Sequence, residues 1–258
     1  MVDIHSHILP GLDDGSPSME TTIEMLAQAV AAGTTDIVAT PHASPTYTFD
    51  PAAVAERLAA ARAAAPAGIT IHQGADFHID YDLVQDALAN PRRYSINAGP
   101  YLLIELPEQV PLRTVPQVVE TLMRAGLMPI LTHPERYFLL RGKVDVVKQW
   151  AASGCLVQVT AQSLTGMFGS TARKMCEDLL DARAVHFVAS DAHDTENRTT
   201  RLDAAQEWLT SRYGAQRAEQ VLVLNPRATL TGAPLPSLSE RGSRGGSERQ
   251  RPLWKFWS

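Results

Sequence analysis

The chain has 258 residues, of which 45% are hydrophobic and 20% are charged, and its formal net charge is −5 at pH 7. This length and apolar content can build one large core, so we expect a single α/β domain of barrel size. The charge divides into +3 on residues 233–258 and −8 on residues 1–232, and an acidic body argues against broad nucleic-acid binding.

Short β-rich runs alternate with helical patterns along the chain, which favours a parallel sheet with crossover helices over a sandwich. Seven runs are predicted as strands: residues 2–5, 36–40, 69–76, 101–106, 127–132, 155–160 and 185–190. Between the first two, Ser16 or Ser18 can cap a helix that ends at Gly33. Further helices are predicted over residues 52–65, 114–124, 143–152 and 172–180. A seven-unit β/α barrel fits this pattern best.

The first predicted strand carries an unusual density of polar side chains. It reads Asp3-Ile4-His5-Ser6-His7 and is followed by Asp13-Asp14-Gly15. Side chains alternate in an extended segment, so His5 and His7 are expected on one face, where they can bind one cation together. Asp13 is placed to orient one of these imidazoles through a hydrogen bond.

Other potential metal ligands also lie at or just after the carboxyl ends of predicted strands, as His5 and His7 do. These residues are His42 after the second strand, Asp76 in the third, Glu105 in the fourth, His133 after the fifth, and Asp191 and His193 after the seventh. Catalytic residues of β/α barrels gather at this rim. We therefore expect side chains between positions 5 and 193 to converge on one mouth.

Histidines and carboxylates without cysteine ligands suit Mn, Fe or Zn in a catalytic role. The number of candidate ligands implies more than one ion, and clustered ions typically serve the hydrolysis of phosphate esters. That chemistry also needs positive groups around the phosphoryl oxygens. Arg136 and Arg198 follow rim ligands closely and are the candidates. His193 is a candidate proton donor as well as a ligand.

The two cysteines point away from thiol chemistry. Cys155 and Cys176 are too few for a disulfide framework and are expected as buried thiols. Neither begins a Cys-x5-Arg phosphate loop, because Ala161 and Ala182 stand at the arginine positions. The sequence therefore argues against a thiol-phosphatase mechanism.

Several blocks together resemble the PHP (polymerase and histidinol phosphatase) superfamily, and more closely its bacterial protein-tyrosine-phosphatase branch of capsule and exopolysaccharide synthesis. The resemblance runs from residue 1 to about Pro226. It rests on the opening block through Ser16 and on Thr40-Pro41-His42, Gly74-Ala75-Asp76, Leu103-Ile104-Glu105, Thr132-His133-Pro134-Glu135-Arg136-Tyr137 and Ala189-Ser190-Asp191-Ala192-His193.

The resemblance implies a distorted seven-stranded barrel with three metal ions, usually manganese, that hydrolyses phosphotyrosine on the tail of a bacterial tyrosine autokinase. It assigns His5, His7, Asp76 and Asp191 to the first ion, Asp76, Glu105 and His133 to the second, and Asp14, His42 and His193 to the third. Arg136 and Arg198 match arginines around the substrate phosphate. The bridging position usually holds glutamate, and we expect a small shift of backbone or metal to accommodate Asp76.

Two other functions are compatible with the residues: a small-molecule phosphatase of the histidinol-phosphate type or a nuclease-like relative, and an inactive metal-holding regulatory module. No apolar run approaches the roughly 18 residues that a membrane helix needs, and no secretory signal is present, so a cytoplasmic location is expected. The barrel is expected over residues 1–232. Residues 233–258 are expected to form a disordered basic tail. Two alternatives stay open for its terminal aromatic cluster: contact with an anionic membrane or the kinase, and a solvated tail without a role. The sequence carries no signal for the oligomeric state.

Overall fold

A computed structural model of the chain describes residues 1–108 and 110–236, and every paired strand in it runs parallel to its neighbours. The strands are β1 (Val2–Ser6), β2 (Asp36–Ala39), β3 (His42–Ala43), β4 (Thr70–Gln73), β5 (Asp76–His78), β6 (Tyr101–Glu105), β7 (Met128–Leu131), β8 (Leu156–Thr160) and β9 (Phe187–Ala189). One sheet has the order β1-β2-β4 and the other has the order β3-β5-β6-β7-β8-β9.

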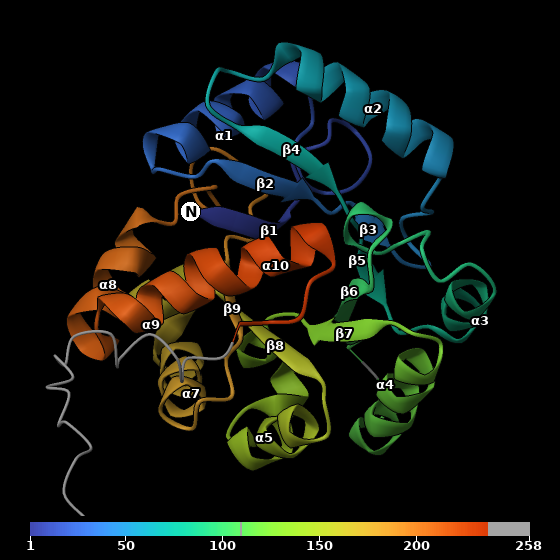
Figure 1. The fold of residues 1–258 in the computed structure, drawn as a ribbon, viewed down its shortest axis with the longest axis vertical. Helices are drawn as coiled ribbons and strands as arrows, with labels where there is room; N and C mark the ends of the chain where they lie inside the picture. Colours follow the sequence, from blue (N-terminus) through green and yellow to red (C-terminus); the bar gives the residue numbers. More distant parts are fainter. Residues whose placement is uncertain (109, 237–258) are drawn as a thin grey trace, which may run out of the picture.

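Helices surround the curled sheets, as Figure 1 shows. The α-helices are α1 (Met19–Ala31), α2 (Pro51–Ala64), α3 (Tyr81–Ala89), α4 (Val115–Arg124), α5 (Val144–Ala152), α6 (Ala161–Thr165), α7 (Gly169–Asp181), α8 (Asp203–Tyr213), α9 (Ala215–Glu219) and α10 (Asn225–Thr231). Short 3-10 turns are η1 (Ile96–Ala98), η2 (Leu112–Thr114), η3 (Pro134–Arg136) and η4 (Phe138–Leu140), and a π-helical turn, η5, covers Gln220–Leu224. Ser18 caps α1 by accepting a hydrogen bond from the Thr21 amide, so the second of the two expected serines is the cap.

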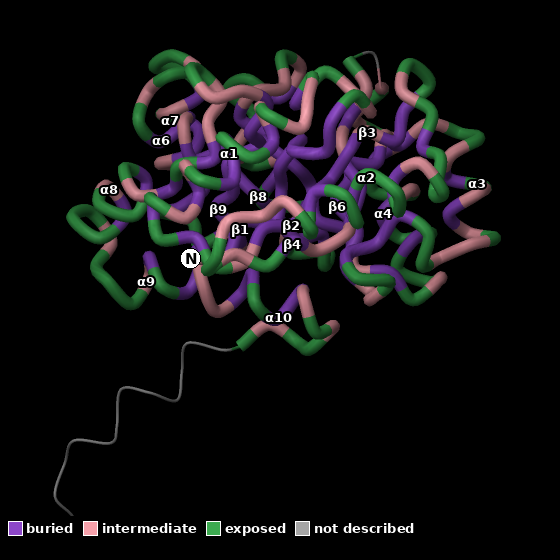
Figure 2. The backbone as a smooth tube through the Cα atoms, turned by 90° about the horizontal axis from the view of Figure 1, so that it is seen from above, coloured by how far each residue is buried: buried purple, intermediate pink, exposed green. Residues whose placement is uncertain are grey.

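The strands are buried on both faces, as expected for parallel sheets covered by helices. In β6, Tyr101 and Leu103 belong to an inner apolar cluster, whereas Leu102 and Ile104 pack against the helices. This alternation puts the next residue, Glu105, on the inner side of the carboxyl end. Figure 2 shows the central strands as buried backbone inside a partly exposed helical layer.

One end of the inner cluster is closed by α10. Leu230 of α10 and Leu235 after it pack against the cluster, and the Tyr101 hydroxyl donates a hydrogen bond to the Ala233 carbonyl. Tyr101 begins β6, so this is the amino-terminal end of the strands. Figures 1 and 2 show α10 lying across the sheets on that side. The carboxyl-terminal end is thus left for a site.

Residues 1–108 and 110–236 form nine strands where seven are expected, because the second and third predicted strands are each followed, after a short break, by a further short strand. Thr40-Pro41 separates β2 from β3, and Gly74-Ala75 separates β4 from β5. Proline has no amide hydrogen for the ladder. A Cβ on Gly74 would lie 2.9 Å from Val38 Cγ1, which marks a close approach of neighbouring strands. Both breaks change the direction of the chain immediately before a candidate ligand, His42 or Asp76.

The predicted closed barrel is observed as two curled parallel sheets that meet between β1 and β9. Their contact includes one isolated bridge, Ser6 to Ala192, together with a hydrogen bond of 2.9 Å from the Asp191 amide to the His5 carbonyl. The contact places the first and the last candidate ligands side by side.

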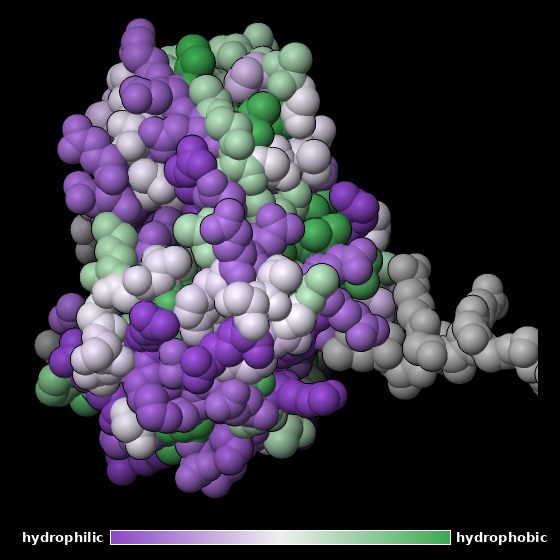
Figure 3. All heavy atoms as spheres, turned by 90° about the vertical axis from the view of Figure 1, so that its left-hand side faces the viewer, coloured by the Kyte–Doolittle hydropathy of each residue, from purple (hydrophilic) through white to green (hydrophobic). Residues whose placement is uncertain are grey.

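Both cysteines are buried free thiols, as expected. Within residues 1–108 and 110–236, no helix is both long and apolar enough to span a bilayer. Hydrophilic side chains predominate on the face over α8 and α9, with hydrophobic ones scattered among them (Figure 3). The predicted tail lies almost wholly outside the described residues, which end at Pro236.

Candidate metal centre

The structure brings all nine candidate ligands together at the ends of β1, β2, β4, β6, β7 and β9, with His42 and Asp76 beginning the short strands β3 and β5 that follow β2 and β4. Their ligand atoms form overlapping groups in which all atoms lie within 4.8 Å of one another: His7-Asp14-His42-His193, His5-His7-Asp76, His5-His133-Asp191, Asp76-Glu105-His133, and a group of His42, His78 and Glu105. Ligands from six strand ends and the loop after β1 therefore share one small volume.

His5 and His7 present their Nε2 atoms to the same point, 3.3 Å apart. The other nitrogen of each ring has a hydrogen-bond partner on the side away from this point. His5 Nδ1 lies 3.1 Å from Gln158 Oε1, and His7 Nδ1 lies 2.7 Å from Asp13 Oδ2. Such outer contacts fix the tautomer and the direction of metal-binding imidazoles. Asp13 thus occupies the orienting position expected of it, toward His7.

Simple alternation does not by itself explain the placement of His5. Ile4 belongs to the inner cluster, and His5 contacts the inward Gln158, so neighbouring residues face the same side. The register of β1 against β2 shifts between Asp3 and Ser6. A bulge of this kind re-aims a side chain.

Asp76 is a completely buried carboxylate, and neither of its oxygens has a hydrogen-bond donor in the described residues. His5 Nε2 and His42 Nδ1 lie 3.5 and 3.4 Å from Asp76 Oδ2. A buried charge is costly unless it is paired or coordinates a metal ion. Burial raises the pKa of Asp76, but the cationic histidines outweigh it and hold this pKa well below its ordinary value. The residues present therefore fit bound cations.

Glu105 and His133 form the side of the centre next to β6 and β7. His133 Nε2 lies 3.5 Å from Glu105 Oε1 and 3.9 Å from Asp191 Oδ2. Burial lowers the pKa of His133 to about 3, so its imidazole is neutral and able to bind a metal ion near pH 7. His133 and Asp191 both have positive φ, +30° and +51°. Such backbone conformations in non-glycine residues are uncommon and cluster at functional sites.

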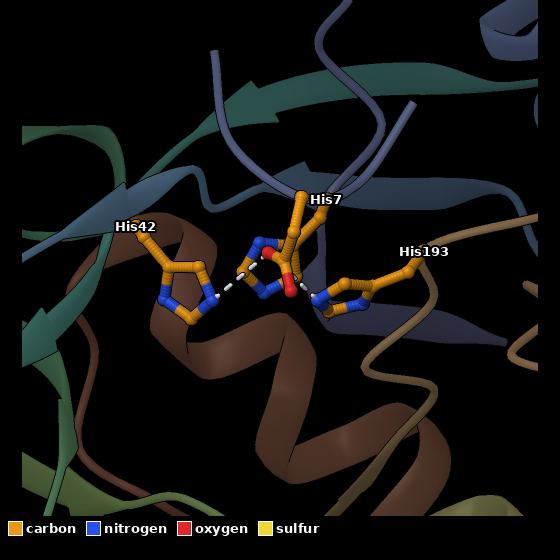
Figure 4. Close-up of side chains that lie close together, drawn as sticks. His7, His42 and His193 are labelled. Carbon is orange, nitrogen blue, oxygen red and sulfur yellow. Dashed lines mark ion pairs between the residues drawn. The ribbon is translucent and has the colours of Figure 1, made fainter. Parts of the chain in front are cut away.

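Three histidines from separate segments gather around Asp14 at the outer side (Figure 4). Asp14 Oδ1 lies 3.3 Å from His42 Nε2 and 3.4 Å from His193 Nε2, and its side chain is 47% exposed. Gly15 packs against His7, because a Cβ there would lie 2.2 Å from the His7 carbonyl oxygen. Only glycine fits this approach without moving the loop that carries Asp14.

His193 is held at both ring nitrogens, which suits a metal ligand, and its role as a proton donor stays a prediction. Its Nδ1 lies 3.0 Å from the Asp191 carbonyl oxygen and so donates to it. The remaining nitrogen, Nε2, faces Asp14. Both ring nitrogens therefore face acceptor oxygens of the protein.

Both expected arginines reach the centre. Arg198 Nη2 lies 2.6 Å from Asp191 Oδ2, and Arg136 Nη1 pairs with the same oxygen. The Arg136 guanidinium also lies over the Phe168 ring, 4.4 Å from its centroid. Two guanidinium groups therefore converge beside the candidate ligands, where an anionic substrate group would lie.

Two residues that support the centre, Gln158 and Glu135, were missed by sequence reasoning, and a third, His78, was left without an assigned role. Gln158 holds His5, and its inward position in a buried strand was a usable signal. Glu135 accepts bonds of 2.8 Å from the Thr160 amide and the Ser163 hydroxyl, which fixes the turn that carries Arg136. His78 Nε2 lies 2.5 Å from Glu105 Oε2; its position two residues after Asp76 predicts an approach to the site, with helix capping or substrate contact as equal alternatives.

Comparison with known proteins gives a consistent match over nearly the whole described chain. The family model "Capsular polysaccharide synthesis, CpsB/CapC" matches residues 1–231. CapC of Staphylococcus aureus is 37% identical over 203 residues, covering 77% of this chain and 79% of that protein. The tyrosine-protein phosphatase YwqE of Bacillus subtilis is 34% identical over 221 residues, covering 84% and 86%.

Solved structures agree. A crystal structure from the pair YwqE of B. subtilis and CpsB of Streptococcus pneumoniae, described as unique metal-dependent tyrosine phosphatases, superposes with a TM-score of 0.84 at 31% identity. The match covers 91% of this chain and 96% of that one. A zinc-bound amidohydrolase of the COG1816 group superposes with a TM-score of 0.52 at 11% identity, which shows a shared fold and nothing about activity.

Proposed function

This chain belongs to the CpsB/CapC family of capsular polysaccharide synthesis proteins, and from this membership we infer that it is a metal-dependent tyrosine phosphatase. The observation in the molecule that carries this function is the buried Asp76 carboxylate among the histidines. Its two unpartnered oxygens and the adjacent guanidinium groups combine a place for cations with a place for a phosphoryl group.

We propose that the nine candidate ligands hold three divalent ions, with manganese as the preferred metal. His5, His7, Asp76 and Asp191 would hold the first, Asp76, Glu105 and His133 the second, and Asp14, His42 and His193 the third. Bound divalent ions would supply positive charge for the phosphoryl oxygens and a lowered pKa for water. Counting β2 with β3 and β4 with β5 gives seven strands, and we propose that their carboxyl ends form the rim of a distorted barrel, six of them carrying ligands.

The protein's own side chains would bind and orient the substrate. Arg136 and Arg198 would each donate to phosphoryl oxygens, since both guanidinium groups already converge on one point beside the ligands. Phe168 stacks on Arg136 and limits its motion. A phenolate leaves fairly readily, so the reaction needs no strong general acid; His193 would be the candidate donor.

We propose that the substrate is the phosphorylated tyrosine tail of a bacterial tyrosine autokinase that controls capsule or exopolysaccharide synthesis. Support comes from family membership, because the related proteins are named as tyrosine phosphatases and the family model concerns capsular polysaccharide synthesis. A cytoplasmic location, where such a tail would meet the enzyme, stays a prediction from the sequence.

The function is tested by measuring hydrolysis of a phosphotyrosyl peptide before chelation, after chelation and after addition of manganese. We expect activity to be lost on chelation and restored by manganese. Histidinol phosphate serves as the comparison substrate, because the small-molecule alternative predicts the opposite preference. Activity that survives complete removal of metal, or a protein without activity in all three states, would overturn the proposed function.

A further inference from the structure

A cavity of about 470 Å³ opens beside the candidate centre, and its lining combines charged and apolar side chains. In the lining, Glu105, His133 and Arg136 belong to the centre or adjoin it, and Glu108 adds a further carboxylate. The lining also includes Leu106 and Phe138, whose side chains are apolar. A ligand that fills the cavity must therefore combine an anionic group with an apolar body.

Phe138 is the exposed wall of this cavity. It begins η4, two residues after Arg136, and 71% of it is exposed to solvent. The Arg141 guanidinium lies 5.1 Å from the centroid of the Phe138 ring, which braces the ring through a cation–π contact. The neighbouring Tyr137 donates its hydroxyl hydrogen bond to the Pro107 carbonyl, so the chain before Phe138 is also tied down. An exposed but braced aromatic ring is preorganised to stack on a ligand.

Exposed large hydrophobic residues of the described chain concentrate near the same rim. Tyr81 follows β5, Phe138 follows β7, and Met167 follows the short helix after β8, so all three lie in segments that leave the carboxyl ends of strands. The other two, Ile23 and Met123, lie on the outer helices α1 and α4. The distribution favours contact with a ligand at the mouth over scattered surface exposure.

We propose that the exposed Phe138 and the buried Leu106 together form a wall that contacts the phenyl ring of a phosphotyrosyl residue. This contact would set the preference for aryl over alkyl phosphates. The inference rests on the proposed function, whose phosphoryl site it extends outward. Arg136 links the cavity to the phosphoryl site: it lines the cavity and pairs with Asp191 at the centre. In an aryl phosphate the ring is attached directly to the phosphoryl oxygen, so a phosphoryl group bound by Arg136 leaves the ring beside the apolar side chains of the cavity. A phosphoserine side chain has no ring and leaves the wall uncovered.

The experiment compares Phe138→Ala, Phe138→Tyr and wild type in the metal-loaded full chain. KM is measured for a phosphotyrosyl peptide, and competitive inhibition constants are measured for inorganic phosphate and for the phosphoserine version of that peptide. Loss of a stacking partner is expected to raise KM of the phosphotyrosyl peptide roughly threefold to tenfold in Phe138→Ala. Both inhibition constants are expected to stay at their wild-type values, because neither inhibitor has a ring.

Phe138→Tyr keeps the aromatic face and is expected to retain the wild-type KM within about twofold. Met123→Ala removes another exposed hydrophobic side chain, on α4, and is expected to change none of the constants. An unchanged KM in Phe138→Ala, or an equal rise of KM and of both inhibition constants, would overturn the ring-wall assignment. Absence of hydrolysis by the metal-loaded wild type would instead overturn the proposed function, so the two failures are distinguishable.

Discussion

Asp76 has the most demanding electrostatic environment in the candidate centre. It is completely buried, faces His5 and His42, and has no hydrogen-bond donor for either oxygen in the described residues. Removing one partner from a buried network of charges costs far more than removing an exposed charge. The side chain is also shorter than the glutamate that the resemblance leads one to expect at this position, so its contribution can be tested directly.

Asp76→Asn keeps the size of the side chain and removes its charge. We expect the protein to lose at least one bound metal ion and the turnover of a phosphotyrosyl peptide to fall about 100-fold or more, because a shared ligand is weakened. Elemental analysis and steady-state kinetics measure the two effects. Asp36→Asn is the matched control, since Asp36 also pairs with a histidine, His72, but at the amino end of its strand. Normal metal content in Asp76→Asn would contradict the assignment.

The histidines of the centre make metal binding dependent on pH. Burial lowers the pKa of His5, but Asp76 and Asp191 outweigh it and raise the pKa to about 9 in the metal-free protein. His5 is therefore protonated at pH 7, whereas a metal ion binds the neutral ring. We expect manganese binding at pH 7 to release protons, and the apparent affinity to rise as the pH increases from 7 to 9. Calorimetric titrations in buffers of different ionisation enthalpy measure the release; an affinity independent of pH would be the contrary result.

At the scale of elements, the sequence was informative about the strands and about the ligands at their carboxyl ends. Each predicted strand coincides with an observed one, because apolar runs of four to eight residues between glycine and proline signals predict buried strands well. The interruptions at Pro41 and Gly74 were missed, since they depend on how neighbouring strands approach. The register shift in β1 was missed for the same reason, as were the contacts of Gln158 and Glu135.

Glu135 connects the turn η3 to the start of α6, and its contribution is separable from that of Arg136. Glu135→Ala leaves the Thr160 amide and the Ser163 hydroxyl without their acceptor. We expect the free energy of unfolding to fall by about 1–3 kcal/mol and kcat/KM to fall with it, because the turn also carries Arg136. Glu135→Gln retains an acceptor oxygen and should lose less of both. Denaturant unfolding and kinetics on the two variants provide the comparison, and equal losses would argue against this role.

At the scale of the whole molecule, α10 and the segment after it close the amino-terminal end of the strands, opposite the candidate centre. Leu235 packs on the inner cluster and the Ala233 carbonyl accepts from Tyr101. The fold and the candidate centre are formed by residues up to Pro236. The proposed contact of the terminal aromatic cluster with a membrane or a kinase lies outside the described residues and stays a prediction.

Two truncations separate these parts of the chain. A protein that ends at Pro236 is expected to hydrolyse a phosphotyrosyl peptide within about twofold of the full chain and to unfold at the same denaturant concentration. A protein that ends at Gly232 lacks the segment that contacts Tyr101 and the inner cluster and is expected to unfold at a lower concentration. Denaturant titration monitored by circular dichroism measures both. Equal stability of the two truncated proteins would contradict the closing role of residues 233–236.

The most direct test of the three-metal centre is anomalous X-ray diffraction from crystals of the manganese-loaded protein. We predict three anomalous peaks at the carboxyl ends of the strands: one among His5, His7 and Asp191, one between Glu105 and His133, and one among Asp14, His42 and His193, with Asp76 shared by the first two. Crystals that contain the folded protein and abundant manganese, yet show no anomalous peak beside Asp76, would contradict it.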